Sequence, residues 1–301
     1  MMLDRMEGNA ELKTSVQQML ATRRLTHSVL LVGEAGLGTG FAARCIAADY
    51  LYPAGGAAAE ALLRGECCRA VAKAGKRDSG TVETGIVREA ISVSGMGSGG
   101  KYLVGQVTAM RSEIFNTSLS AEGRAVLLYH VERMNEESAN ALLKVMEEPP
   151  EGVLFLLTAD SLASVLPTIR SRCAAYTMAP VPTEECAAAL RTAQPELNEQ
   201  NAQDLAFLYE GHIGLCLKAL TDPAAKVARA AARELCRQAQ QQDTYRVQAL
   251  LAGYEKDKDS AAAVLWQATQ AASAALRRPG FDGVQPDTAA RILSLIHISE
   301  P

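Results

Sequence analysis

The sequence predicts an α/β domain built on a parallel sheet, followed by two all-helical segments. Continuous apolar runs such as 152–158 lack the alternation of a half-exposed strand and are typical of strands buried on both faces. Helical patterns separate these runs as far as Pro180, and only helical patterns follow it. This order favours a parallel sheet with helical additions, and we expect domains at 1–178, 179–222 and 223–301.

Composition and charge narrow the possible functions. The 301 residues suggest about two domains, and 48% hydrophobic with 21% charged residues excludes wholesale disorder. A net charge of −4 means that contact with nucleic acid requires a local patch or partner proteins. No apolar run approaches the roughly 18 residues that span a bilayer, and the start lacks an apolar signal segment. Seven cysteines that fit no disulfide framework are consistent with a reducing cytoplasm, which is the expected location.

Each element of the α/β domain has a local signature. The predicted strands are apolar runs, at 27–33, 124–131, 152–158 and 174–178. The predicted helices carry apolar residues at helical spacing, at 8–26, 41–52, 104–116, 135–148 and 161–173. Asn135 is a good N-cap, because its side-chain oxygen can accept a hydrogen bond from the first turn. The segment 53–101 gives a weaker signal, with loop-like stretches at 53–60 and 93–100 and a short helix expected at 67–75.

The helical part is divided by its composition. Three short helices are predicted within 181–222, and they form a small lid. Alanine then fills 17 of the 60 residues from 221 to 280, which is typical of packed helices. The last eight residues, SLIHISEP, resemble a translated sequencing-adaptor tail, with a natural short tail as the alternative. We therefore assign no function to them.

The glycine-rich turn GEAGLGTG lies between a predicted strand and a predicted helix. The glycines that fit the phosphate-loop frame G-x-x-x-x-G-K-[ST] are Gly33, Gly36 and Gly38. Thr39 replaces the lysine that contacts phosphate, and Gly40 replaces the hydroxyl that binds Mg²⁺. Two interpretations stay open here: a decayed nucleotide loop, and a glycine-rich turn that never bound a nucleotide.

The residues at the end of the second predicted strand indicate that the chain does not hydrolyse a nucleotide. A nucleotide hydrolase of this type carries Asp-Glu at that end, for Mg²⁺ and for the attacking water, whereas this chain has Tyr129 and His130. Mg²⁺ prefers carboxylate oxygens, so neither residue is a plausible ligand. His130 is therefore interpreted as a packing or surface residue. The loss of all four chemical groups predicts a chain that does not hydrolyse ATP, and we predict no metal site.

Several segments together resemble the clamp-loader branch of AAA+ proteins. The matching segments are HSVLLVGEAGLG, VERMNEESANALLKVMEEPP and LFLLTADSLASVLPTIRSRC. The ANALLK-hydrophobic-EEPP block and the SRC triplet are specific to this branch, and order and spacing match over 7–178. Within the branch, the chain is most similar to the delta-prime family of bacterial DNA polymerase III.

This resemblance implies a AAA+ P-loop-type α/β domain, a lid and a C-terminal collar in a non-catalytic subunit of a five-subunit loader. Such a loader opens the sliding β clamp and places it on primer–template DNA during replication. The implied partners are the tau or gamma ATPase subunits, the delta subunit, the clamp, and DNA through the assembled complex, without a membrane. Arg172, flanked by Ser171 and Cys173, would supply an arginine finger to the neighbouring ATPase subunit.

The resemblance also identifies positions where nucleotide contacts are lost. The degenerate loop consists of Gly33, Gly36, Gly38 and Thr39. We expect no productive ATP binding there, although passive nucleotide binding stays open. Thr158 stands at the sensor-1 position, where a strand-end hydrogen bond is an alternative role. In the lid, Gly214 and Leu215 stand where a sensor-2 arginine is expected.

The resemblance further raises the question of zinc, since the family often carries a four-cysteine zinc module after the loop helix. Structural zinc requires ligands at spacings such as C-x-x-C. Here Cys67 and Cys68 are adjacent, and Tyr52 stands near the place of the first family cysteine. We expect a module without zinc, and no cofactor.

Two alternative functions remain. The first is an active ATPase subunit of the same loader, which requires Thr39 and Tyr129–His130 to be functional substitutes. The second is a AAA+-like adaptor without catalytic activity that acts elsewhere. Intrinsic ATPase activity would identify the first, and failure to co-purify with the other loader subunits would identify the second.

Overall fold

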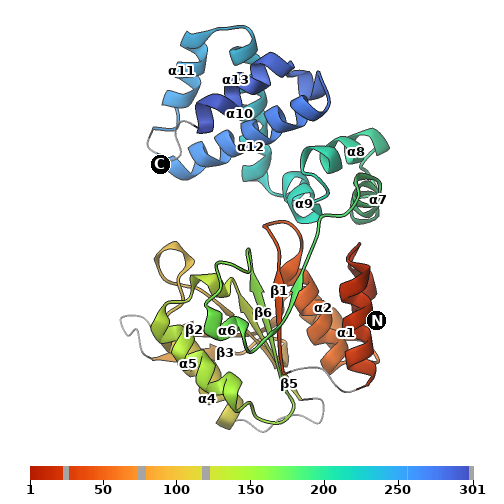
Figure 1. The fold of residues 1–301 in the computed structure, drawn as a ribbon, viewed down its shortest axis with the longest axis vertical. Helices are drawn as coiled ribbons and strands as arrows, with labels where there is room; N and C mark the ends of the chain where they lie inside the picture. The colour runs from red at the N-terminus through yellow and green to blue at the C-terminus, as the bar shows by residue number, and fades with distance from the viewer. Residues whose placement is uncertain (23–26, 74–78, 117–122, 256, 298–301) are drawn as a thin grey trace. The chain divides into compact units, whose positions relative to one another are not determined.

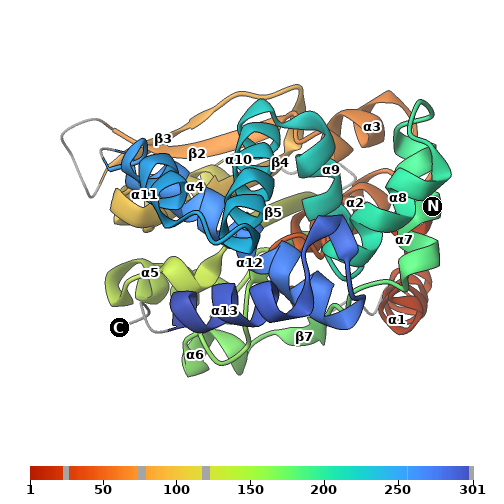
Figure 2. The same ribbon diagram turned by 90° about the horizontal axis from the view of Figure 1, so that it is seen from above.

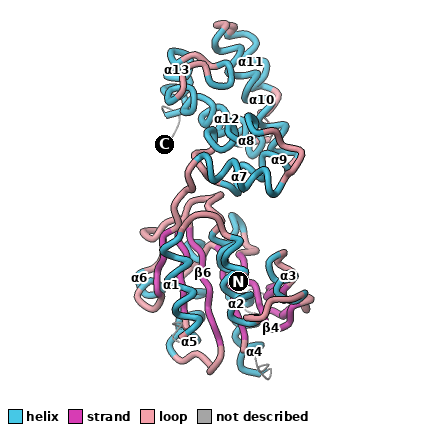
Figure 3. Tube along the Cα trace, turned by 90° about the vertical axis from the view of Figure 1, so that its right-hand side faces the viewer, coloured by secondary structure: helices cyan, strands magenta, loops and turns pink. Residues whose placement is uncertain are grey.

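The computed structural model describes residues 1–22, 27–73, 79–116, 123–255 and 257–297. The chain forms two compact units, Met1–Pro180 and Val181–Pro301. Figure 3 shows that the strands of the described chain belong to the first unit and that the second unit is helical. Both predicted helical segments fall in the second unit, and their separation at residue 222 stays a prediction.

A seven-stranded sheet forms the centre of the first unit in the described chain (Figure 1). The strands are β1 Ser28–Val32, β2 Cys67–Ala72, β3 Gly80–Glu83, β4 Val87–Ser94, β5 Arg124–Tyr129, β6 Val153–Ala159 and β7 Ala174–Thr177. Their order across the sheet is β3-β2-β4-β5-β6-β1-β7. Figure 2 shows β3 beside β2, and this antiparallel pair closes one edge, whereas the other neighbours are parallel.

Helices cover both faces of the sheet. They are α1 Ala10–Ala21, α2 Thr39–Leu51, α3 Ala57–Leu63, α4 Val104–Asn116, α5 Glu136–Glu147 and α6 Pro167–Arg170, with 3₁₀ turns η1 Met2–Arg5, η2 Ser98–Gly100 and η3 Val131–Arg133. Val29 and Leu31 of β1 pack in one core with α1, α2 and α3, whereas Leu30 packs in the other core with α4, α5 and α6. All five residues of β1 are buried, which confirms the strand buried on both faces.

The prediction for 53–101 was wrong in its secondary structure. The segment predicted as a short helix, 67–75, begins as strand β2, and the loop-like stretches 53–60 and 93–100 contain the start of α3 and the end of β4. Short, alanine-rich sequence gives a weak strand signal, and β2 is a strand because it pairs with β4 on one side and β3 on the other. Tertiary pairing therefore overrides local propensity in this segment.

The second unit contains seven helices in the described chain. They are α7 Thr183–Ala193, α8 Glu199–Leu208, α9 Ile213–Thr221, α10 Pro223–Gln240, α11 Thr244–Ala252, α12 Lys258–Arg277 and α13 Pro286–His297, with a 3₁₀ turn η4 Phe281–Gly283. This confirms the three short helices predicted within 181–222 and the helical pattern predicted after them. The Tyr209 hydroxyl donates to Gln267 Oε1 at 2.8 Å, and this bond joins the end of α8 to α12.

The first half of the SLIHISEP tail continues α13, and residues 298–301 lie outside the described residues. Among the described residues, no helix combines the length and the hydropathy needed to cross a membrane.

Candidate functional site

The glycine-rich turn has the backbone shape of a phosphate loop. Gly36 and Gly38 have φ of 94° and 84°, in the left-handed region that favours glycine. Gly38 is the N-cap residue of α2, so the turn leads directly into the positive end of a helix dipole, a position that favours anions. A Cβ at Gly33 would lie 3.1–3.3 Å from side-chain atoms of Leu37, Thr39 and Met178. This close packing explains the need for glycine there without any nucleotide.

A tyrosine ring packs at the start of α2, beside Gly40, the position that carries a hydroxyl in the phosphate-loop frame. A Cβ added at Gly40 would lie 3.3 Å from Tyr129 Cε1 and 3.7 Å from Arg44 Nη1. Burial raises the pKa of the Tyr129 phenol, and its hydrogen bond with Arg44 acts in the opposite direction. The two replaced positions, one in the loop and one at the strand end, are therefore in steric contact.

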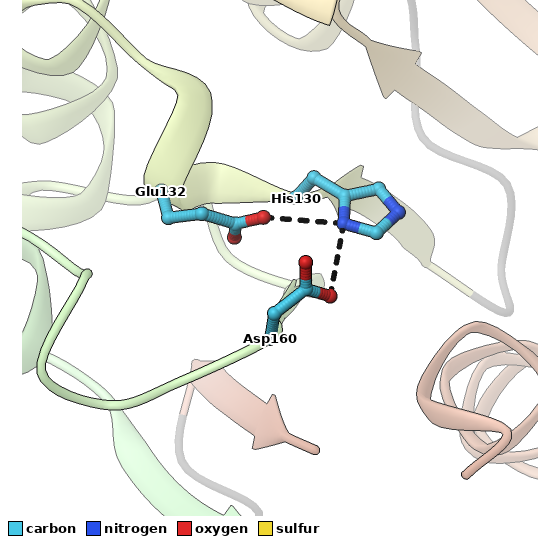
Figure 4. A group of neighbouring side chains, drawn as sticks. All are labelled: His130, Glu132 and Asp160. Carbon is cyan, nitrogen blue, oxygen red and sulfur yellow. Dashed lines mark hydrogen bonds and ion pairs between the residues drawn. The ribbon is translucent and has the colours of Figure 1, made fainter. Parts of the chain in front are cut away.

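The carboxyl ends of β5 and β6 bring together three side chains (Figure 4). Because these strands are parallel neighbours, their ends meet at one edge of the sheet. His130 Nδ1 lies 3.2 Å from Glu132 Oε1 and 3.4 Å from Asp160 Oδ1. His130 was predicted as a packing or surface residue, and Glu132 and Asp160 were not predicted to have a role. These three side chains, within the described part of the chain, lie close enough together to hold a metal ion.

Thr158 is buried near the end of β6. Its hydroxyl accepts a hydrogen bond of 3.1 Å from the His130 backbone N–H. The strand-end hydrogen bond considered for Thr158 is thus present, and it joins the end of β6 to the residue that follows β5. A sensor role for Thr158 stays a prediction.

Arg172 lies in the turn that follows α6. Its side chain is 37% exposed and forms an ion pair with Glu147 at the end of α5, with 2.5 Å between Nη2 and Oε1. Nη1 also donates to the Thr168 carbonyl oxygen at 3.0 Å. The Ser171 hydroxyl donates to the same carbonyl at 3.1 Å, and burial raises the pKa of the Cys173 thiol to about 12. The Arg172 guanidinium is therefore accessible to solvent, and its Nη2 atom is paired with an exposed glutamate.

The other predicted positions lie apart from this edge of the sheet or in the second unit. Cys67 and Cys68 are buried free thiols of β2 whose side chains enter opposite cores, so the two thiols do not face one site. The Tyr52 hydroxyl donates to Glu89 Oε2 at 2.8 Å. Gly214 and Leu215 lie in the first turn of α9.

Comparisons with known proteins find similarity in the same region of the sequence that resembles the clamp-loader branch. A family model described as DNA polymerase III, delta subunit, matches residues 8–182. The chain is 42% identical over 84 residues to DNA polymerase III subunit delta' of Haemophilus influenzae, covering 28% of this chain and 25% of that protein. It is 33% identical over 149 residues to subunit delta' of Pseudomonas aeruginosa, covering 49% and 41%. The matched segments thus span a quarter to about two fifths of these relatives.

Solved structures share the fold. A structure of a single-residue variant of the RuvB protein of Thermotoga maritima has a TM-score of 0.50 and 15% identity to this chain, and the match covers 95% of each chain. At this identity the likeness concerns the fold alone, and it agrees with the predicted α/β domain followed by helices.

Proposed function

Since the chain belongs to the DNA polymerase III delta subunit family, we propose that it is a delta-prime-like clamp-loader subunit that does not hydrolyse ATP. The observation that carries the proposal is the contact between Gly40 and the Tyr129 ring. In a working site, a hydroxyl at the first position and a carboxylate at the second would hold Mg²⁺. Here the second position carries an aromatic ring, and a Cβ at the first position would lie 3.3 Å from it.

The loop keeps only its backbone contribution to phosphate binding. Thr39 cannot supply the positive charge that offsets the β- and γ-phosphates. Backbone N–H groups and the helix dipole remain, so weak nucleotide binding is compatible with the proposal and turnover is not.

We propose that Arg172 acts on a neighbouring subunit instead. A guanidinium stays charged at all physiological pH values and forks onto phosphate oxygens, which suits it to stabilise charge on a transferring phosphoryl group. Its partner Glu147 is 51% exposed, and an exposed pair contributes only about 0–1 kcal/mol. Exchanging this carboxylate for a phosphate therefore has a small energetic cost.

The partners follow from this role. We propose assembly with tau or gamma ATPase subunits and with the delta subunit, and action on the β clamp and primer–template DNA in the assembled loader. The relatives bear the names of polymerase III subunits, which supports this assignment. The net charge of −4 favours DNA contact through the complex over independent binding.

Two measurements test the proposal. The isolated chain should show no ATP turnover above background, whereas turnover abolished by a substitution in the 33–40 loop would identify an active ATPase subunit instead. The chain should also co-purify with the other loader subunits from a co-expression strain. Failure to co-purify, with the chain folded, would favour an adaptor that acts elsewhere.

A further inference from the structure

The side chains of His130, Glu132 and Asp160 converge on one point at the carboxyl ends of β5 and β6 (Figure 4). We propose that they form a binding site for one divalent transition-metal ion, for which Zn²⁺ is the best fit. The site lies beside the loop, since Asp160 follows the residue whose carbonyl oxygen accepts the Gly33 N–H. It shares no residue with the loop or with Arg172, and the proposal does not depend on the proposed function.

The distances fit a tetrahedral ion. Bonds of about 2.0–2.1 Å from Zn²⁺ to nitrogen and oxygen place two tetrahedral ligands about 3.3–3.4 Å apart. His130 Nδ1 lies 3.2 Å from Glu132 Oε1 and 3.4 Å from Asp160 Oδ1. Figure 4 shows the Nδ1 edge of the ring facing both carboxylates, so an ion seated among the three atoms requires little rearrangement.

Charge and burial also favour a cation. The Glu132 side chain is only 11% exposed, and its Oε2 atom is buried without a hydrogen-bond partner among the described residues. A buried carboxylate oxygen without a partner is costly. The Arg133 Nε atom lies 3.8 Å from Glu132 Oε1, beyond hydrogen-bonding distance. This arginine forms a long ion pair with Glu132, so one positive charge faces two carboxylates, and a divalent ion would balance the remainder.

The backbone holds the imidazole in place. His130 has φ of 58°, a conformation that is uncommon for residues other than glycine and that persists where its surroundings fix it. The Thr158 hydroxyl accepts the His130 backbone N–H at 3.1 Å, and His130 caps the 3₁₀ turn that carries Glu132. The histidine and the glutamate are thus presented by one rigid turn, and Asp160 directly follows β6.

The ligand types select the class of ion. One imidazole and two carboxylates suit Zn²⁺ and its neighbours among the transition metals, whereas Mg²⁺ prefers an all-oxygen set with several waters. His130 and Asp160 side chains are 42% and 44% exposed, which leaves access for a water molecule at the fourth position.

The test is metal binding by the full chain after treatment with a chelator. Calorimetric titration should show a single equivalent of Zn²⁺ bound, with no displacement by excess Mg²⁺. Co²⁺ should give the visible absorption of a tetrahedral nitrogen–oxygen site, without a sulfur-to-cobalt charge-transfer band. That band would assign binding to the free cysteines and overturn the proposal, as would the absence of stoichiometric binding.

Matched variants locate the ion. His130→Ala and Asp160→Asn should each weaken Zn²⁺ binding about 100-fold or more, since losing even an outer partner of a zinc ligand costs about 10–100-fold. The controls His27→Ala and Glu151→Gln alter exposed side chains of the same types and should bind as the parent does. Asp160→Asn keeps the side-chain volume, so it remains informative if His130→Ala fails to fold. Unchanged binding in folded Asp160→Asn would overturn the site.

Discussion

The glycine loop and the Ser-Arg-Cys turn differ in what they offer, a backbone conformation in the loop and an exposed charged side chain in the turn. The loop retains its backbone conformation, with Gly36 and Gly38 in the left-handed region, but lacks the side chains that act on phosphate and Mg²⁺. The turn retains its accessible Arg172 side chain. Backbone conformation and side-chain chemistry are thus found in separate segments of one α/β unit. This difference separates a role within the subunit from a role toward a neighbour, and each prediction below tests one side of it.

The largest expected effect concerns the turn. Arg172→Ala in a reconstituted loader should lower turnover at the adjacent ATP site by about 10³–10⁵-fold, the range known for arginine fingers. Total clamp- and DNA-stimulated ATPase should fall only in part, because the other sites are untouched. Arg170→Ala, which removes an exposed arginine two residues away, is the control and should leave turnover unchanged. Parental turnover in a correctly assembled Arg172→Ala complex would falsify the hypothesis that Arg172 acts as an arginine finger.

The second prediction concerns the loop. Gly40→Thr should destabilise the chain by about 1–3 kcal/mol, because the new side chain overpacks against the Tyr129 ring. In a Tyr129→Ala background the same substitution should cost less, with a coupling of about 0.5–3 kcal/mol. Urea unfolding of the four proteins in this cycle measures both values. Additive effects would mean that the ring does not fill the hydroxyl position.

The third prediction concerns Cys173, which follows Arg172 in the sequence. Burial raises the Cys173 pKa from 9.0 to about 12, so the neutral thiol is favoured at pH 8. Alkylation of Cys173 in the folded chain should be roughly tenfold or more slower than that of an unperturbed thiol, since the thiolate reacts. Its rate should still rise about tenfold between pH 9 and pH 10, where the rate of a thiol with a pKa of 9.0 is already levelling off. Site-resolved mass spectrometry measures the rate, and a rate that levels off between these two pH values would contradict the prediction.

The smallest expected effect concerns the ion pair between Arg172 and Glu147. Glu147→Gln should change the free energy of unfolding by less than about 1 kcal/mol, because both side chains are more than a third exposed. It should leave loader turnover equal to or above the parental value, since the guanidinium is freed. A marked loss of turnover, with stability unchanged, would give Glu147 a direct part in the neighbouring site.

Much of the fold could be predicted because its central strands are continuous apolar runs. β1, β5, β6 and β7 coincide with the four predicted strands. The capping role of Asn135 was confirmed as well, since its Oδ1 accepts the Ser138 N–H at 2.9 Å. These features are local, so the sequence carries them directly.

The remaining features depend on contacts between distant segments. β2 carries the exposed Arg69 amid small residues, and only pairing with β3 and β4 makes it a strand. The group of His130, Glu132 and Asp160 likewise requires β5 and β6 to be neighbours in the sheet. The order of parallel strands was not predicted, so neither feature could be. A search for polar residues at the ends of the predicted strands would have found the group.

The hydrogen bonds at the end of β1 also have an evolutionary consequence. The Gly33 N–H donates to the Ala159 carbonyl oxygen at 2.9 Å, and the Met178 N–H donates to the Val32 carbonyl oxygen at 2.7 Å. The start of the loop is thereby joined to β6 on one side and, on the other, to the segment that continues from Arg172 through β7. Selection for a correctly placed Arg172 would therefore also constrain the backbone of the loop, whether or not the loop binds a nucleotide. Substitutions would accumulate first at side-chain positions such as Thr39, while Gly33 is retained for packing alone.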